Sequence, residues 1–516
     1  MSGGYQTPNS DWRIGGSQAA AGGSSRFKWS TYQRAIFDDV ENGAGHTVVN
    51  AVAGAGKTST LVEAIKHVPH GLRKLFMAFN TLNVKDAKAR LKGVDVEVLT
   101  FHSYGLKAVT QSFTRRPLVT ESGEKRVAAF CRDKYGKSDA TFDMRCALVK
   151  AVERAKNTLA QTEDEIATVL DVCEVDATRY DRAVFIADVI ELLERCKSTR
   201  DGRIDFEDMV WLPVVKKMWV PKFDRVFVDE TQDLNAAQIA LVLRAVKSDG
   251  RILAVGDPNQ AIYQFRGADE HAFENVKTRL SAKELPLSVS YRCCASVVKE
   301  AQKIVSRITA APGAEEGAVQ RSSYEDMRRH AAPGDYIISR TNAPLTTLCM
   351  SFLAEGRHAN IFGRDVSRDL TALVKKSRAK TVADLRDFVR AWSEDECAHL
   401  VARQLDPQRI DDRAKCVLAI SDGAASISDV LEEIERLFTE KDDTDRIMLG
   451  TTHRAKGKES DRVWLLGDTY AAYRYEHSDQ NIGWQTYQAP PSVEDRNLYY
   501  VAVTRAKDTL IIVGPT

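Results

Sequence analysis

The stretch AVAGAGKTST, Ala51–Thr60, decides the fold. An apolar segment, His46–Asn50, runs into its glycines, and LVEAIKHV after it has the pattern of a helix. Glycines let backbone N–H groups curl around a phosphate, and the start of a helix adds positive potential there. Lys57 is placed to reach the β- and γ-phosphates, and Thr58 to hold Mg²⁺ through its hydroxyl. This order predicts a phosphate-binding loop for ATP and Mg²⁺ rather than a chance glycine turn.

The loop residues expected to contact the nucleotide are consecutive. They are Ala53, Gly54, Ala55, Gly56, Lys57, Thr58 and Ser59.

Composition excludes several classes of protein. The chain has 516 residues, and 73 Lys+Arg against 72 Asp+Glu leave a net charge of +1. A polyanion would therefore need a local basic groove. No apolar run reaches the ~18 residues that span a bilayer, which predicts no membrane partner. The nine cysteines include no CxxC pair, so a reducing, cytoplasmic location is expected. Residues 1–26 are expected to form a disordered tail without a signal peptide.

Short β-branched segments alternate with helical stretches, which indicates an α/β fold. Two stretches, about 107–200 and 367–445, look purely helical, and Leu431–Phe438 is the clearest amphipathic segment of the second. The simplest architecture is two α/β domains, each with a helical insertion. The expected strands are His46–Ala51, Lys74–Phe79, Val94–Leu99, Arg225–Val228, Arg251–Val255, Asp335–Ser339, Arg446–Gly450, Arg462–Leu466 and Thr509–Val513.

Acidic and amide side chains follow two of these strands. Asp229 and Glu230 come directly after Arg225–Val228, where Asp229 can bind Mg²⁺ and Glu230 can activate the attacking water. Gln260 follows Arg251–Val255 and is placed to sense the γ-phosphate. Read alone, the acidic pair could be a solvated strand end and the GDPNQ segment a turn.

At this point a series of motifs resembles a known family. The motifs, in order, are AGAGKT, AFNTLN, TFHS, DFEDM, VDETQD, VGDPNQAIYQFRGA, YR, TTHRAKGKE and YVAVTRA. Together they resemble the superfamily 1A helicases, the UvrD/Rep/PcrA-like group, and they run from Gln33 to Ala506. AFNTLNVKDA, VGDPNQAIYQFRGA and SRTNAPL look most like the compact F-box DNA helicase branch and its microbial and viral relatives.

The resemblance implies two RecA-like domains that clamp ATP between them. It assigns residues 27–106 and 201–285 to domain 1A, 107–200 to insertion 1B, 286–366 and 446–516 to domain 2A, and 367–445 to a short insertion 2B.

The resemblance also implies nucleotide contacts outside the loop. Gln33 matches the glutamine that reads adenine, and Tyr291 matches the tyrosine that stacks on it. Arg292 and Arg505 match two arginine fingers that donate to the γ-phosphate region when the cleft closes. Glu459 matches the carboxylate that contacts the ribose. Without the family, Gln33 would be read as a surface residue and the charged residues as partners in surface salt bridges.

Single-stranded DNA requires a phosphate track and aromatic faces on which bases can stack. The residues that match the family's strand contacts are Phe79, Asn80, His102, Tyr263, Phe265, Arg266, Thr451 and His453. The alternative for each aromatic is a place in a core. These contacts address phosphates, sugars and base faces, so little sequence specificity is expected. Nothing in them reads a 2′-hydroxyl, and RNA stays open as a substrate.

The resemblance implies an ATP-dependent 3′→5′ DNA helicase that acts on single strands and on junctions of single and double strand. The short second insertion, 367–445, and the lack of a duplex-splitting hairpin after Thr509–Val513 leave efficient unwinding as the weaker expectation. Two alternatives stay open: a translocase that strips proteins from single strands, and a motor subunit in a repair, replication or defence complex. The expected location of the protein is the bacterial nucleoid or, for a viral protein, the host cytoplasm.

Overall fold

The computed structural model describes residues 29–113, 116–120, 122–136, 141–173, 175, 177, 180–198, 202–264, 267–269, 271–402, 405–439, 445–471, 474–479, 483–488 and 492–514. The expected tail at 1–26 lies outside the described residues. In these ranges, no helix is long and apolar enough to cross a bilayer.

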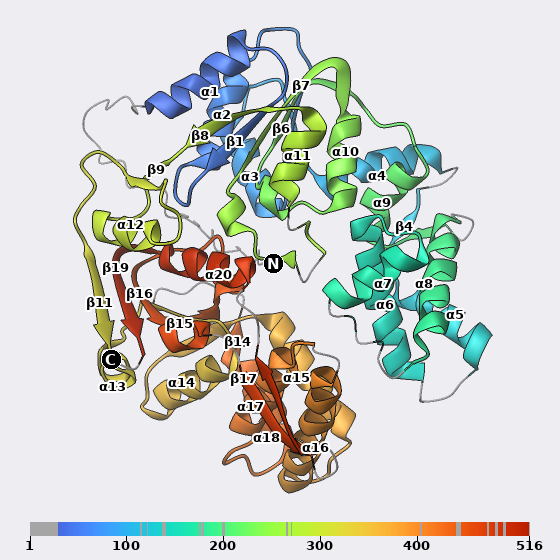
Figure 1. Cartoon of the computed structure of the whole chain (residues 1–516), viewed down its shortest axis with the longest axis vertical. Helices are drawn as coiled ribbons and strands as arrows, with labels where there is room; N and C mark the ends of the chain where they lie inside the picture. Colours follow the sequence, from blue (N-terminus) through green and yellow to red (C-terminus); the bar gives the residue numbers. More distant parts are fainter. Residues whose placement is uncertain are drawn as a thin grey trace, which may run out of the picture.

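The first sheet has six parallel strands in the order β3-β2-β6-β7-β1-β8, at the top of Figure 1. Its strands are β1 Thr47–Ala51, β2 Lys74–Ala78, β3 Glu97–Thr100, β6 Phe223–Val228, β7 Val246–Gly256 and β8 Lys283–Leu287. The inner strands β2, β6, β7 and β1 contain runs of buried apolar residues, as expected for a parallel sheet covered on both faces. One face carries α1 Thr31–Asn42, α2 Lys57–Lys66 and α3 Thr81–Arg90. The other carries α4 Phe101–Ser112, α9 Asp208–Val215, α10 Ala236–Ala245 and α11 Ala272–Leu280.

The second sheet is also parallel, with the strand order β11-β19-β16-β12-β15-β13-β14. Its strands are β11 Ala318–Ser322, β12 Tyr336–Ser339, β13 Ala359–Phe362, β14 Phe438–Thr439, β15 Ile447–Thr451, β16 Ser460–Leu466 and β19 Ala506–Val513. Helices α12 Ala295–Gln302 and α20 Val493–Val503 join its core to that of the first sheet. Helices α13 Tyr324–His330 and α14 Ala343–Ala354 cover the other face. We call the two sheets with their covering helices the first and the second domain.

All of the strands expected from the sequence are present, with ends shifted by a few residues. The first insertion, on the right of Figure 1, is largely helical, and its core is separate from that of the sheet but includes residues of α9. Its helices are α5 Glu124–Tyr135, α6 Thr141–Thr158, α7 Glu163–Val172 and α8 Arg182–Lys197. Thr162 caps α7 in a reciprocal pair with Glu165. The expectation of a purely helical stretch is wrong at one point, because β4 Leu118–Val119 pairs with β5 Arg203–Ile204 where the chain leaves and returns.

The second insertion has helices α15 Arg364–Ser377, α16 Val382–Val401, α17 Gln408–Ile420 and α18 Ile427–Leu437, at the bottom of Figure 1. It shares one core with the outer face of the second sheet. Helix α18 contains most of the expected amphipathic segment and buries Val430, Ile434 and Leu437, which are spaced for one helical face. The two insertions therefore differ: the first packs against helix α9, away from the core of its sheet, and the second shares the core of its sheet.

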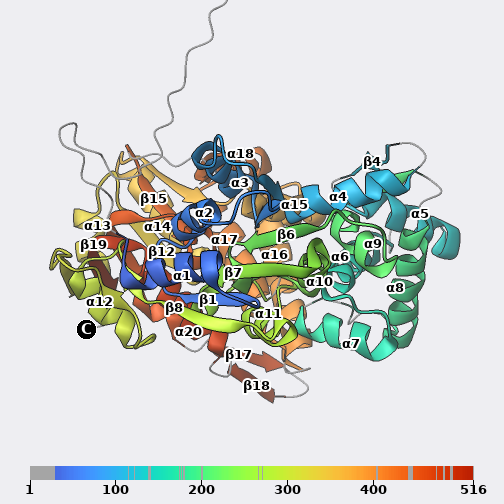
Figure 2. The same cartoon turned by 90° about the horizontal axis from the view of Figure 1, so that it is seen from above.

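Some elements were not expected. An antiparallel hairpin, β17 Arg474–Asp479 with β18 Gly483–Gln488, lies between β16 and α20 and projects from the body in Figure 2. The duplex-splitting hairpin of larger relatives would follow the last strand, and no sequence pattern indicated a hairpin between β16 and α20. A short parallel pair, β9 Val289–Ser290 with β10 Thr309–Ala310, lies where the chain passes from the first domain to the second.

A buried ionic cluster attaches the first insertion to the first domain. Lys156 of α6 lies 2.5 Å from Asp205 Oδ2 and 2.8 Å from Asp208 Oδ1, and all three side chains are nearly fully buried. Arg126 of α5 lies 3.1 Å from Asp208 Oδ2 and donates to the Cys196 sulfur. The grouping of Cys196 with the two carboxylates resembles a metal site in composition. Lys156 and Arg126 already neutralise the two carboxylates, so the cluster has a structural role.

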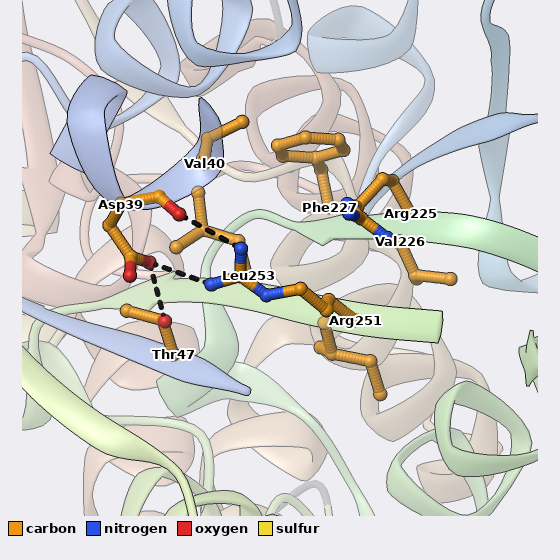
Figure 3. Close-up of a pocket in the computed structure, with 9 residues that line it drawn as sticks. Asp39, Val40, Thr47, Arg225, Val226, Phe227, Arg251 and Leu253 are labelled. Atoms are coloured by element: carbon orange, nitrogen blue, oxygen red, sulfur yellow. Dashed lines mark hydrogen bonds and ion pairs between the residues drawn. The ribbon is translucent and has the colours of Figure 1, made fainter. Parts of the chain in front are cut away.

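Helix α1 is tied to the first sheet at the edge where strands β1 and β7 begin. Arg251 donates to the backbone carbonyl of Asp39 at 2.8 Å and lies 3.1 Å from its carboxylate, which also accepts from Thr47 at 2.7 Å (Figure 3). The cavity beside these groups is about 10 Å³, room for about one water molecule. The contacts of Arg251 and Asp39 hold helix α1 against the sheet, and the cavity is too small for a ligand.

Candidate nucleotide and nucleic-acid site

A cavity of about 450 Å³ lies between the two domains, beyond the carboxyl ends of β1, β6 and β7. Its first-domain wall consists of Gly54, Ala55, Gly56, Lys57, Thr58, Ser59, Phe79, Asn80, Asn83, Glu230, Asp233, Gln260 and Tyr263. Its second-domain wall consists of Arg292, Lys456, Gly457 and Arg505. Open α/β sheets bind ligands at this edge. Residues expected at the nucleotide and residues expected on the strand line one cavity.

The phosphate loop has the backbone that its glycines predict. Gly54 and Gly56 have φ values of 72° and 75°, which side chains with a Cβ rarely adopt. Gly56 immediately precedes α2, so the first N–H groups of that helix face the cavity with the positive end of its dipole. The loop and helix therefore offer the anion-binding geometry expected from the sequence.

The two expected metal ligands lie side by side. The Thr58 hydroxyl donates to Asp229 Oδ2 at 2.7 Å, and Asp229 is fully buried at the end of β6. Burial, reinforced by repulsion from Glu230, raises the pKa of Asp229 to about 7, although the bond from Thr58 acts against this. Hydroxyl and carboxylate oxygens are ligands that suit Mg²⁺, and a divalent cation would neutralise this buried carboxylate. The residues present fit the ion.

Glu230 is held close to the loop lysine. Lys57 Nζ lies 3.1 Å from Glu230 Oε2, which also accepts from Gln232 Nε2 at 2.7 Å. Burial disfavours the ionised carboxyl, but the charges of Lys57 and Lys456 outweigh it and lower the pKa of Glu230 to about 2. Glu230 also has φ of 54°, a strained value for a residue with a side chain. The fold therefore keeps this carboxylate ionised at the phosphate end of the cavity.

Gln260 lies on the same wall of the cavity. Its side-chain amide donates to Asp257 Oδ2 at 2.8 Å, and the residue is 5% exposed on the cavity. It follows β7, as the sequence analysis expected.

The arginines of the second-domain wall are bound within their own domain. Arg292 Nε lies 2.6 Å from Glu459 Oε2, so the residues expected at the γ-phosphate and at the ribose are paired with each other. Arg505 Nε donates to the Val501 carbonyl at 2.8 Å, and its Nη1 donates to the Lys458 carbonyl at 3.2 Å. Burial, then the neighbouring Arg292, lower the pKa of Arg505 to about 9. Both side chains still line the cavity.

The residues expected at the adenine lie near the loop. Gln33 is buried, and its side chain accepts from Ser30 N at 3.0 Å and donates to Thr60 Oγ1 at 3.0 Å. Both halves of this amide are therefore used within the protein. Tyr291 is 44% exposed, and its backbone N–H donates to the Gly54 carbonyl at 2.9 Å. Of these two residues, Tyr291 is therefore the one whose exposed ring could contact a base.

The residues expected to contact single-stranded DNA differ in exposure and position. Phe79 is 39% exposed, and Asn80 beside it caps α3 by accepting from Asn83 N at 2.8 Å. Tyr263 is half-buried, with its hydroxyl 3.3 Å from the His453 carbonyl across the domain boundary. Thr451 is buried at the end of β15. Phe265 and Arg266 lie outside the described residues.

His102 has a partner that the sequence analysis did not name. Its ring stacks on Phe206 with centroids 3.8 Å apart and planes 25° from parallel, and Phe206 is 43% exposed. Burial lowers the pKa of His102 to about 4, so the imidazole is neutral at pH 7. The DFEDM motif contained the signal: an aromatic residue between two acidic ones, in a segment that follows the helical insertion.

Comparison with known proteins agrees with this geometry. The model of the UvrD/REP helicase N-terminal domain matches residues 32–281, and that of the UvrD-like helicase C-terminal domain matches residues 361–514. The chain belongs to the UvrD-like helicases. The resemblance carried by the motifs is thereby confirmed.

Curated relatives of this UvrD-like helicase are distant in sequence. F-box DNA helicase 1 of Gallus gallus is 23% identical over 93% of the chain and 48% of its own length. ATP-dependent DNA helicase UvrD2 of Mycobacterium bovis is 24% identical over 90% of the chain and 75% of its own length. ATP-dependent DNA helicase PcrA of Bacillus subtilis is 25% identical over 51% and 37%. The chain therefore spans about half the length of F-box DNA helicase 1 and less than half that of PcrA.

Sequence reasoning missed one cation of this UvrD-like helicase. Lys456 Nζ lies 2.6 and 2.7 Å from the two carboxylate oxygens of Asp233 and 2.6 Å from the Gln260 carbonyl. It also lies 4.7 Å from the centre of the Tyr263 ring. Lys456 therefore links the second domain to Asp233 and Gln260 on the nucleotide wall and to Tyr263, which is expected to contact DNA. It stood within the TTHRAKGKE motif, but nothing in one sequence indicates which carboxylate it meets.

Proposed function

We propose that this UvrD-like helicase hydrolyses ATP to move 3′→5′ along single-stranded DNA and to open junctions with duplex. One observation supports this most: the phosphate loop, two second-domain arginines and the aromatic residues Phe79 and Tyr263 line one cavity. Hydrolysis and strand contact would therefore act on the same few side chains. The direction of movement rests on the family resemblance.

Hydrolysis is assigned to the first-domain wall. The loop N–H groups and Lys57 bind the phosphates, and Glu230 orients and deprotonates the attacking water. Thr58 and Asp229 would hold Mg²⁺, which supplies charge neutralisation at the phosphates when bound. Gln260, beside Asp257, contacts the γ-phosphate end.

Coupling to movement is assigned to the second-domain wall. The transition state spreads negative charge over the γ-phosphoryl oxygens, and a guanidinium stabilises that charge only when it lies within reach. Arg292 and Arg505 must therefore exchange their own-domain partners for phosphate as the cleft closes. That exchange makes hydrolysis depend on the relative position of the two domains.

Binding of single-stranded DNA is assigned to aromatic side chains of the first domain. Phe79, Tyr263, and Phe206 on His102 present ring faces, and stacking of unpaired bases tolerates any sequence. Lys456 and the backbone near Thr451 face the same track from the second domain. A partner protein from repair, replication or defence would bind elsewhere on the chain.

The deciding experiment compares duplexes with a 3′ tail, with a 5′ tail and without a tail, beside ATP hydrolysis on bare single strands. We expect hydrolysis to rise with single-stranded DNA and unwinding to favour the 3′ tail. The variant Lys57→Ala is the control for contaminating activity. Unwinding from the 5′ tail alone would contradict the direction. Stimulated hydrolysis with removal of a protein block but no unwinding would favour the translocase alternative. No hydrolysis under any condition would refute the motor.

A further inference from the structure

Residues of the second domain and its connecting segment hold the backbone of the phosphate loop directly. Arg307 Nη1 donates to the Asn50 carbonyl and its Nη2 to the Ala51 carbonyl, each at 2.8 Å. The Tyr500 hydroxyl accepts the Ala53 N–H at 3.0 Å. With the bond from Tyr291 to Gly54 described above, these contacts cover the chain from the end of β1 into the loop.

Close packing accompanies these bonds. A Cβ placed on Gly54 would lie 2.6 Å from both Arg292 Cβ and Ser290 Oγ. Such a separation is shorter than van der Waals contact, so an alanine at this position would push the second domain away from the loop. Gly54 therefore serves the approach of the second domain as well as the backbone turn.

Tyr500 belongs to the same helix that leads to Arg505. It lies in α20, is fully buried, and precedes Arg505 by five residues. The Arg505 guanidinium is bound to the Val501 carbonyl of that helix. Because a helix moves as one body, a displacement that carries Arg505 toward or away from phosphate also changes the bond from Tyr500 to the loop.

Arg307 reaches a second group on the nucleotide wall. Its Nη2 lies 3.7 Å from Asp257 Oδ1, and the other oxygen of Asp257 accepts from Gln260. Arg307 thus touches the end of β1 and the carboxylate that orients the expected γ-phosphate sensor. Arg307 lies just before β10, which pairs with β9 where the chain passes from the first domain to the second.

We propose that Tyr500 and Arg307 are positioning residues that form a clasp on the phosphate loop and set the distance between the loop and the arginines of the second domain. This inference rests on the proposed ATP hydrolysis, which gives the distance its purpose. The clasp contacts no phosphate. Its loss should therefore affect the transition state, where loop and arginines act together, more than ground-state binding.

The test uses Tyr500→Phe and Arg307→Gln in the full chain, with DNA-stimulated hydrolysis as the first readout. Tyr500→Phe keeps the buried ring and removes the acceptor for Ala53 N–H. Each variant should lower kcat by about 3–10-fold, the range of one or two lost hydrogen bonds, with KM for ATP and ADP affinity within about twofold. Matched controls are Tyr499→Phe on the same helix and Lys303→Gln on the same connecting segment.

The double variant tests whether the two residues act as a unit. If both hold one loop position, the combined loss should be smaller than the product of the single losses. A product of independent effects would refute the clasp as a unit. A kcat within twofold of wild type for both single variants would refute the positioning role, and an equal loss of kcat, ADP affinity and Tm would assign a structural role instead.

Hydrogen exchange separates this inference from the proposed function. In Tyr500→Phe, the Ala53 amide should exchange faster than in wild type, in a peptide covering residues 46–56, whether or not the protein hydrolyses ATP. Unchanged exchange there would refute the contact in solution. A wild type with no DNA-stimulated hydrolysis but faster exchange in the variant would refute the function and leave the clasp standing.

Discussion

In the nucleotide cavity, the loop lysine of the first-domain wall pairs with a carboxylate of the same wall, whereas the arginines of the second-domain wall are bound to a carboxylate and to backbone carbonyls of their own domain. Lys57 meets Glu230 at 3.1 Å without help from the second domain. Arg505 instead donates to the carbonyls of Val501 and Lys458. The two walls therefore differ in readiness: the first wall already places its lysine and carboxylate at the phosphate loop, and the arginines of the second wall must leave their present partners before they can contact phosphate.

The largest effect is expected on the first wall. Lys57→Ala should reduce ATP turnover by more than about 1,000-fold, because it removes the cation of the loop that cradles the phosphates. Steady-state hydrolysis with saturating single-stranded DNA measures the change. Lys66→Ala, on the exposed end of the same helix, should behave as wild type. A Lys57→Ala variant with more than a tenth of normal turnover would show that the first wall does not depend on its lysine.

The second wall should lose turnover without losing ground-state affinity. Arg292→Ala and Arg505→Ala should each lower kcat by about 1,000-fold, the scale of an arginine finger, while ADP affinity changes less than about threefold. Arg505 is buried, so Arg505→Lys provides a variant that keeps a charge and most of the volume. ADP titration by fluorescence beside kcat measures the split. Parallel losses of both quantities would mean that these arginines bind the ground state, as the first wall does.

Glu230→Gln should separate binding from chemistry within the first wall. The amide cannot accept a proton from water, so kcat should fall by about 100–1,000-fold while ATP still binds. The metal-side carboxylate, Asp229, remains. Equilibrium binding of ATP under conditions of no turnover, beside single-turnover hydrolysis, measures both. Glu63→Gln on α2 is the control, and near-native turnover in Glu230→Gln would assign the base to another group.

Tyr263, which contacts the second domain at the boundary between the two walls, should affect DNA affinity rather than nucleotide binding. Tyr263→Ala removes a ring that contacts the His453 backbone and lies beneath Lys456, so single-strand affinity should fall by about 1–3 kcal/mol, or about 5–150-fold. Fluorescence anisotropy with a labelled oligonucleotide measures it. Trp219→Ala, an equally large exposed aromatic outside the cavity lining, should have no effect. A large drop in Tm with unchanged DNA affinity would make Tyr263 a core residue.

The smallest effect tests whether the second wall restrains its arginine. The Arg292–Glu459 pair is partly exposed, and such pairs contribute about 0.2–1 kcal/mol. Glu459→Gln should therefore raise DNA-independent turnover by about 1.5–5-fold, because Arg292 is released. If Glu459 contacts ribose instead, KM for ATP should rise and discrimination against 2′-deoxy-ATP should be lost. The two nucleotides compared in one assay decide between these roles.

Much of the fold could be predicted because its central strands are apolar and its loop motif is specific. Strands β8, KELPL, and β11, AVQRS, escaped prediction, because at these exposed edges polar residues and proline do not mark a strand. The loop residues, Asp229 and Glu230 were predictable from local context. The contacts of Lys456, Arg307 and Tyr500 were not, because each joins segments far apart in the chain.

The place of β1 in the first sheet bears on how the protein is made. This strand, which carries the phosphate loop, pairs with β7 and β8 alone among the described strands. At roughly 5–20 residues per second, a ribosome needs about 10–40 s to add the roughly 200 residues that separate β1 from β7. The first insertion and helix α9, whose shared core is complete before β7 is made, can pack during that interval. The nascent loop strand therefore has no strand to pair with until β7 has been made.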